Sequence, residues 1–362
     1  MTGMGKESGS VFVVGIGACT AVGTTALSSA AAVRAGISAF SEHPFMIDAT
    51  GNPMIVARAS YLSDNPILIE RLLQLAVPAA NEVLIPLNGI SEKNPPIPVI
   101  IGLPSQRPGL PETLDTQIVE KFNLMIGNSF QFSSIETIHT GHSAGLMALE
   151  SGWQKIKHGV TDFCLIGGIE SYLEPETLEW LESCDQIHSA GEFNNAWGFV
   201  PGEAAGLCLL ASEKIVQRYR LKPLAQILAS ATATEMNLIK TNTVCLGEGL
   251  TAAFKQVLPS LPKPDARVDE ILCDMNGEPY RAEEYGFAST RVAEKFTDPS
   301  DFLAPADCWG DVGAASGPLF VCLAVAAWWK GYEKGPYALL WTSSEGGERS
   351  ATVLGKKVLQ GM

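Results

Sequence analysis

The stretch Thr140-Gly141-His142-Ser143-Ala144-Gly145 joins an expected β-strand to an expected helix that extends from Gly145 to Lys157. After this helix, Phe163 to Ile166 is a short apolar run, which is typical of a buried strand. The pair Gly167-Gly168 that follows is interpreted as a turn. A glycine-rich loop, a helix and a strand in this order indicate an α/β unit.

The same order of features recurs in the second half of the chain. Its members are the loop Gly313 to Gly317, an apolar helix near Pro318 to Trp329, the strand Leu339 to Trp341 and the pair Gly346-Gly347. This repetition predicts a duplicated α/β fold with an N-terminal half, residues 1–220, and a C-terminal half, residues 221–362. Because strands and helices alternate, we expect mostly parallel sheets covered by helices.

Two details near the N-terminus can be checked against a structure. Val11 to Val14 is expected to form a buried strand that ends in a turn at Gly15-Ile16-Gly17. Thr24 to Ala35 is expected to form a helix of small residues ended by Gly36. Further helices are expected at 67–84 and 250–257, and further strands at 98–103, 207–210, 225–229, 271–274 and around 353.

Composition excludes several classes of function. The 362 residues carry a net charge of −14, and 46% of them are hydrophobic. Nucleic-acid binding is disfavoured, because a basic face supplies most of that affinity. An anionic membrane surface and a strongly acidic protein partner are disfavoured for the same reason. The longest apolar run, 318–329, is shorter than the ~20 residues of a membrane span, and predicts a helix buried on all sides.

The cysteines and the N-terminus favour the cytoplasm. The eight cysteines lie mostly in apolar segments without a CxxC pair, so we expect small buried hydrophobes rather than disulfides or a zinc site. The first ten residues, MTGMGKESGS, lack the apolar core of a signal peptide. No motif for a cofactor or a metal ion is found, so neither is expected.

Five segments resemble β-ketoacyl synthases of the thiolase superfamily. They are VVGIGACTAVG (13–23), RAGIS (34–38), DFCLIGG (162–168), GFVPGEAAG (198–206) and GDVGAASG (310–317). These segments follow the family's order along nearly the whole chain. The resemblance implies a thiolase-like fold, in which two similar α/β halves form five layers, αβαβα. Members of this family are usually dimers, so a homodimer is also implied.

The family's catalytic positions are altered in this sequence. The resemblance places His142 at the position of the nucleophilic cysteine, and Asn276 and Asp311 at the positions of the two catalytic histidines. The family's lysine before the last loop corresponds to Ala306, and the phenylalanine of its closing Gly-Phe-Gly-Gly turn corresponds to Glu345. Condensation needs a thiolate to carry the acyl group and hydrogen-bond donors to stabilise an enolate. A carboxylate at Asp311 would repel that enolate, so the resemblance implies a degenerate active site.

A hydrolase remains an alternative, because Gly141-His142-Ser143-Ala144-Gly145 also fits the G-x-S-x-G nucleophile elbow, with Ser143 as nucleophile. A triad then needs a later histidine, and only His158 and His188 follow. His158 lies at the far end of the helix that begins at the elbow, which leaves His188. The structural interpretation is that these glycines allow the backbone to enter the helix tightly.

Two further groups have weaker signals. His139 and His142, with Glu136 nearby, match no strong metal-binding spacing, so ordinary histidines are expected. Cys308 and Cys273 each lie three residues before a family catalytic position and are candidates for a substitute thiol. Packing as small hydrophobes is the simpler interpretation of both cysteines.

The leading interpretation is a catalytically degenerate synthase homologue that binds another protein. The segment NAWGFVPGE (195–203) also resembles synthase-like proteins encoded beside bacterial type VI secretion effectors, which implies an adaptor for a secreted effector in a bacterial cytoplasm. A partner subunit of an active synthase, comparable to a chain-length factor, is a related possibility. The alternative from a different class is an enzyme with altered acyl-transfer or hydrolase chemistry through Ser143, Cys308 or His142.

Overall fold

The computed structural model of the chain describes residues 9–63, 67–88, 90, 96–127, 130–190 and 195–357. The helices are α1 (Ala26–Arg34), α2 (Leu68–Val83), α3 (Leu114–Ile126), α4 (Ala144–Lys157), α5 (Pro175–Ser183), α6 (Glu213–Tyr219), α7 (Glu248–Val257), α8 (Pro279–Thr290), α9 (Ala306–Trp309) and α10 (Ser316–Lys330). The strands are β1 (Val11–Thr20), β2 (Phe40–Ile47), β3 (Pro53–Ala57), β4 (Ile97–Gly102), β5 (Phe132–Ile138), β6 (Phe163–Ser171), β7 (Glu203–Ser212), β8 (Ala225–Thr234), β9 (Glu270–Cys273), β10 (Phe302–Leu303), β11 (Tyr337–Ser343) and β12 (Glu348–Lys356).

The main sheet contains the same strand order twice. Its ten strands run β10-β9-β11-β12-β8-β1-β7-β6-β4-β5, so the order β1-β7-β6-β4-β5 is repeated by β8-β12-β11-β9-β10. The two sets join where the start of β1 pairs antiparallel with the start of β8, from Val11 opposite Ile227 to Val13 opposite Ala225. The expected pair of similar α/β halves is therefore confirmed, while the division at residue 220 stays a prediction.

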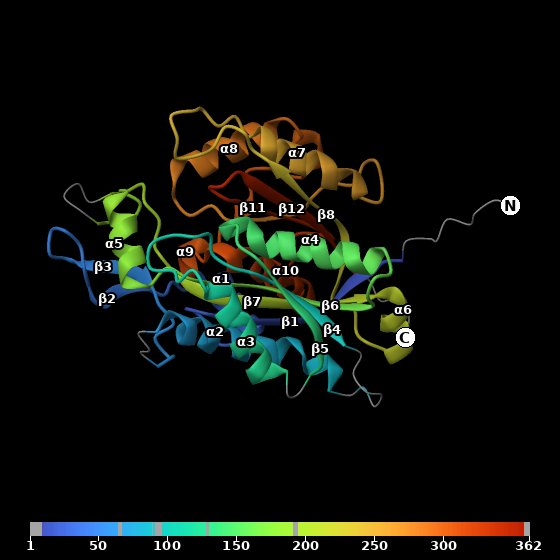
Figure 1. Cartoon of the computed structure of the whole chain (residues 1–362). Coiled ribbons are helices and arrows are strands. Elements are labelled where there is room, and N and C mark those ends of the chain that lie inside the picture. Colours follow the sequence, from blue (N-terminus) through green and yellow to red (C-terminus); the bar gives the residue numbers. More distant parts are fainter. Residues whose placement is uncertain are drawn as a thin grey trace.

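The halves stack as five layers (Figure 1). Helices α2 and α3 pack on the outer face of the N-terminal strands, and α7 and α8 pack on the outer face of the C-terminal strands. Between the two sets of strands lie α4 and α10. This αβαβα arrangement is the one expected for the thiolase-like fold.

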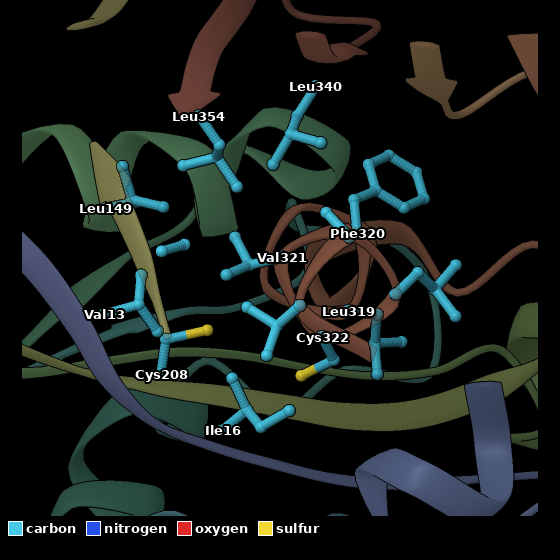
Figure 2. Packing of buried hydrophobic residues seen from close by; sticks show 14 of the residues in the cluster. Val13, Ile16, Leu149, Cys208, Leu319, Phe320, Val321, Cys322, Leu340 and Leu354 are labelled. Atoms are coloured by element: carbon cyan, nitrogen blue, oxygen red, sulfur yellow. The ribbon is translucent and has the colours of Figure 1, made fainter. Parts of the chain in front are cut away.

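The central helix α10 is buried on nearly all sides, as its unbroken apolar sequence predicts. Figure 2 shows its residues Leu319, Val321 and Cys322 among side chains of both halves of the sheet. On the N-terminal side these include Ile16, and on the C-terminal side Leu354. Each half buries its inner face against the same helix, so neither half completes its core alone.

The sheet is mixed rather than mostly parallel, which corrects the sequence expectation. In both halves, the strand next to the join, β7 or β12, runs antiparallel to both of its neighbours. The connection from β6 to β7 does not cross the sheet as a βαβ unit. Instead it passes through α5, which packs with β3 in a separate small apolar cluster. A strand–helix–strand order in the sequence is the same whether the helix crosses over between parallel strands or, like α5, packs outside the sheet between antiparallel ones.

Two expected turns lie inside continuous strands. Strand β1 continues through Gly15 and Gly17, and β6 continues through Gly167 and Gly168. A Cβ atom on Gly17 would lie 2.1 Å from the carbonyl oxygen of Ala79 in α2. On Gly168 it would lie 2.0 Å from a carbonyl oxygen in the loop before α10. These glycines therefore allow helices to approach the strands closely, rather than reversing the chain.

We expect Gly17→Ala to lower the free energy of unfolding by about 1–3 kcal/mol, because the added methyl group must displace the backbone of α2. Gly286, within α8, is the matched control, since a Cβ atom there has no neighbour within 4 Å. Gly286→Ala should raise stability by up to about 1 kcal/mol through helix propensity. Urea unfolding followed by tryptophan fluorescence measures both changes, and equal effects of the two variants would contradict the close-approach explanation.

Candidate functional site

The loop that holds His142 forms the entry to α4, where a 3-10 turn spans Gly141–Ser143. Gly141 has φ +68°, a left-handed conformation that favours glycine. A second 3-10 turn, Gly313–Ala315, leads into α10 in the same way. The loops before the two central helices lie against each other, and they bring His142 to Asp311. Both side chains are almost completely buried.

His142 and Asp311 are in hydrogen-bonding contact. The Nε2 atom of His142 lies 2.8 Å from Oδ2 and 2.9 Å from Oδ1 of Asp311. These distances fit an Nε2–H group that donates to the carboxylate. The backbone N–H of Gly313 donates to Oδ1 at 2.8 Å, and the Nδ2 group of Asn276 donates to Oδ2 at 2.6 Å. The structure thus places His142, Asn276 and Asp311, the three residues that the sequence resemblance singled out, in one hydrogen-bonded cluster.

A buried arginine that the sequence analysis missed lies at the centre of this cluster. Arg281 extends from the first turn of α8, is 1% exposed, and its Nη2 lies 3.1 Å from Nε2 of His142. Its Nη1 donates to Asp274 Oδ2 at 2.9 Å and to the carbonyl oxygen of Ser343 at 3.0 Å. Its Nε lies 3.4 Å from Glu278 Oε2. The guanidinium group therefore connects His142 to two carboxylates and to the end of β11.

The pKa directions agree with an ionised network. Burial raises the pKa of Asp311, but His142, Arg281 and the Gly313 N–H outweigh burial, and the pKa lies well below its ordinary value. Burial likewise acts to raise the pKa of Glu278, but Lys240 and Arg281 lower it further than burial raises it. For Asp274, burial dominates and the pKa is raised. Cations thus stabilise the carboxylates of Asp311 and Glu278 against the cost of burial.

A lysine from the loop after β8 covers the outer side of the cluster. Lys240 has φ +57°, an unusual value for a residue other than glycine. Its Nζ lies 3.1 Å from Oε1 of Glu278, pairs with the carboxylate of Glu345 and donates to Gln186 Oε1 at 2.7 Å. Glu345, which the sequence resemblance aligned with a phenylalanine of the family, thus holds this lysine in place.

Little open space remains beside His142. The cavity there has a volume of about 20 Å³, with Arg107, Tyr172, Phe199 and Glu345 among its walls. That volume is enough for about one water molecule. Arg107 itself is buried and bound to Glu170 at 2.7 Å. A cavity of that size does not hold an acyl chain.

Ser143 points away from the cluster. Its side chain is fully buried, and its hydroxyl group donates to the carbonyl oxygens of Glu348 at 2.9 Å and Thr342 at 3.2 Å. Its backbone N–H donates to Ser344 Oγ at 2.8 Å. Within the described residues, Ser143 joins the α4 loop to the β11–β12 hairpin and has no imidazole as a hydrogen-bond partner. This geometry does not make Ser143 a nucleophile.

The two histidines that follow in sequence do not complete a triad. His158 is exposed at the C-terminal end of α4, about 20 Å along the helix from Ser143. His188 follows α5 and is held by a backbone hydrogen bond to Phe199 at 2.9 Å. Neither is recorded within hydrogen-bonding distance of the Ser143 hydroxyl group in the described part of the chain.

The candidate substitute thiols are also turned away. Cys308 is in α9, after Ala306, and its Sγ lies 4.0 Å from the carbonyl oxygen of Val33 in α1. Cys273 directs its Sγ to the carbonyl oxygen of Leu303, at 3.6 Å. Burial raises the pKa of both thiols. Both cysteines pack as small hydrophobes.

The suggested histidine metal site is not assembled. Glu136 binds Lys155, His139 is exposed, and His142 is committed to Asp311. A different trio with suitable ligand atoms, Glu235, Cys245 and Glu284, lies elsewhere in the described structure.

That trio has an alternative structural role. Glu284 is bound by the buried Arg349, and Glu235 accepts the backbone N–H of Gly249 at the start of α7. Both carboxylates therefore already compensate buried protein groups.

No helix in the described part of the chain is long and apolar enough to cross a membrane.

Comparisons with known proteins agree with this fold. Residues 133–214 match the family model described as "Beta-ketoacyl synthase, N-terminal domain". A highly reducing polyketide synthase of Cordyceps militaris, cm3B, is 25% identical over 140 residues, which is 38% of this chain and 5% of the relative. The chain therefore aligns with only a small part of this curated relative.

Solved ketosynthase structures cover nearly the whole chain. A ketosynthase complex with a type II polyketide synthase acyl-carrier protein, AntDE:AntF, superposes with a TM-score of 0.77 at 16% identity and covers 97% of this chain and 100% of that one. A ketosynthase with its chain length factor from Xenorhabdus doucetiae gives 0.75 at 14% identity, over 98% and 100%. The ketosynthase from module 6 of the bacillaene synthase from Bacillus subtilis 168 gives 0.74 at 14% identity, over 96% and 72%. The chain has the thiolase-like fold of ketosynthases.

Proposed function

We propose that this protein is a catalytically degenerate β-ketoacyl synthase homologue that acts as a binding partner of another protein rather than as a condensing enzyme. The observation that carries the proposal is the buried network of His142, Asp311 and Arg281. It occupies the place where the family resemblance puts the nucleophile and the two catalytic histidines. The site offers an imidazole bound to a carboxylate, and no thiolate.

The chemistry of the network supports this proposal in two ways. An acyl group on Nε2 of His142 would have to displace Asp311 and expose a buried carboxylate. An enolate formed beside Asp311 would meet an ionised carboxylate whose lowered pKa keeps it charged at neutral pH. The cavity of about 20 Å³ beside His142 gives no space for the acyl chain itself.

A dimer or a paired subunit is part of the proposal. Strand β5 lies at one end of the main sheet and pairs with β4 only, among the described residues. Its other edge can accept a further strand, either from a second copy of this chain or from an active synthase. Solved relatives include ketosynthases in complex with chain length factors.

Two further parts of the proposal are an adaptor role for a secreted effector and a cytoplasmic location. The adaptor role for a secreted effector rests on the resemblance of residues 195–203. The cytoplasmic location is supported by eight cysteines that are all free, four of which, Cys19, Cys164, Cys208 and Cys273, are buried in strands. Free buried thiols are typical of a reducing compartment.

Acyl transfer is tested by intact-mass measurement after incubation with acetyl and malonyl thioesters, and separately with a fluorophosphonate. We expect no stoichiometric adduct, whereas an active ketosynthase treated in parallel becomes acylated. An adduct that disappears in Ser143→Ala, Cys308→Ser or His142→Gln would overturn the proposal and identify the nucleophile.

Light scattering on the purified protein should give twice the mass of one chain if the β5 edge forms a homodimer.

A further inference from the structure

A groove on the surface lies between the C-terminal ends of α1 and α10, away from the His142 cluster. Its volume is about 480 Å³, within the roughly 300–1,000 Å³ of many ligand pockets. Its floor is formed by small or apolar side chains, Leu27, Ala30 and Ala326. A backbone or side chain of a ligand can therefore approach both helices closely.

Cations and aromatic rings surround this floor. Arg34 and Tyr332 line the groove, and the guanidinium carbon of Arg34 lies 4.0 Å from the centroid of the Tyr332 ring. Lys330 also lines it, beside Trp329, whose side chain is 54% exposed. Lys222 and Trp329 lie beside the groove rather than in its lining, and the Nζ of Lys222 is 4.9 Å from the centroid of the Trp329 ring. We call Arg34, Lys222 and Lys330 the basic triad.

The basic triad has no carboxylate partner within 4 Å among the described residues. Neighbouring cations are paired, since Lys334 binds Asp301 and Lys356 binds Glu333. Other exposed cations of the described chain, such as Lys255 and Lys263, also have no carboxylate within 4 Å. What distinguishes Arg34 and Lys330 is that both line one groove beside exposed or half-buried aromatic rings.

Helix ends account for only part of this arrangement. Arg34 and Lys330 lie in the last turns of α1 and α10, where a cation interacts favourably with the helix dipole. Lys222 belongs to neither helix, and the dipole does not require an exposed tryptophan between two lysines. Aromatic rings fix the flexible cationic side chains in place and so reduce the entropy that binding would cost.

We propose that this groove binds an acidic segment of a partner protein. Carboxylates of the segment would pair with the basic triad, while its backbone lies over Leu27 and Ala31 and its apolar atoms contact Trp329 and Tyr332. The net charge of −14 does not prevent this, because charges more than about 8 Å away are largely screened at physiological salt. The proposal goes beyond the proposed function and does not require the catalytic site to be inactive.

The test uses the full chain and three labelled twelve-residue peptides, in which Ala alternates with Asp/Glu, with Asn/Gln or with Lys. Fluorescence anisotropy at 0.15 M salt is expected to give the tightest binding for the Asp/Glu peptide, by about tenfold over the Asn/Gln peptide. The triple variant R34E/K222E/K330E should abolish this preference. The neutral variant R34Q/K222Q/K330Q should weaken binding about tenfold, and circular dichroism verifies that both variants are folded.

A matched control separates the groove from general charge. K255E/K263E/R267E makes the same change of charge at exposed residues elsewhere and should leave binding of the Asp/Glu peptide unchanged. Equal weakening by the two triple variants, or equal binding of all three peptides, would overturn the proposal. Vesicles containing 30% phosphatidylserine are the second arm, because triad-dependent binding to them without peptide binding would assign the groove to a membrane surface instead. None of these results depends on whether the protein can be acylated.

Discussion

Replacing Arg281 with methionine is expected to lower the free energy of unfolding by about 3–5 kcal/mol, the range for breaking a buried ion pair. Methionine keeps much of the volume of the side chain but leaves Asp274 and Glu278 without their guanidinium partner. The cation is 1% exposed, so water does not replace it without a rearrangement of the site. Loss of the charge is therefore the dominant effect, rather than loss of packing.

Urea unfolding at pH 7 measures this change, and Lys334→Met is the matched surface control. Lys334 pairs with Asp301, but their side chains are 40% and 57% exposed, so that pair should contribute no more than about 1 kcal/mol. Arg281→Lys retains a charge and is expected to lie between the two. If Arg281→Met cost as little as the surface control, the network would not be the stabilising centre of the site.

Much of the fold was predictable from local patterns. Buried strands and the apolar helix α10 are continuous or periodic apolar runs, and their repetition gave the two halves. The antiparallel position of β7 was not predictable, because it depends on the path of residues 172–190 and 195–202 outside the sheet. The glycines of β1 and β6 were misinterpreted as turns. Both a turn and the close approach of a helix to a strand require glycine, so the sequence does not distinguish them.

The site was predictable only in part. The positions of His142, Asn276 and Asp311 followed from the family resemblance, and the structure places them in contact. Arg281 lies in the segment EPYRAEEY, where charges on both sides indicate a solvated helix face. Its inward direction follows from the contact of α8 with the loop at Ser343, which no local pattern reveals. The sequence predicted a carboxylate at position 311, but it did not predict that Arg281 would be the buried cation near it.

The Asp311→Asn variant tests the charge of that carboxylate directly. Asparagine keeps the size and one acceptor oxygen but cannot ionise, so His142 loses its charged acceptor and Arg281 loses a nearby counter-charge. We expect this variant to unfold with a free energy about 3 kcal/mol lower than the wild type at pH 7. Asp301→Asn, at an exposed ion pair, controls for the loss of one surface carboxylate and should cost no more than about 1 kcal/mol.

The difference in free energy of unfolding between the wild type and Asp311→Asn, called the gap below, should shrink as the pH falls. The pKa of Asp311 in the folded protein lies below its ordinary value of 3.8, so the unfolded chain takes up the proton first as the pH falls. The stabilisation is therefore present above about pH 4 and is lost as the pH falls below it. Asp274, with its raised pKa, changes stability in the opposite direction, but it is present in both proteins and largely cancels from the difference. Urea unfolding at steps from pH 5 to pH 3 should show the gap shrinking, and a gap that stayed constant or widened would mean that Asp311 is not held as an ionised carboxylate.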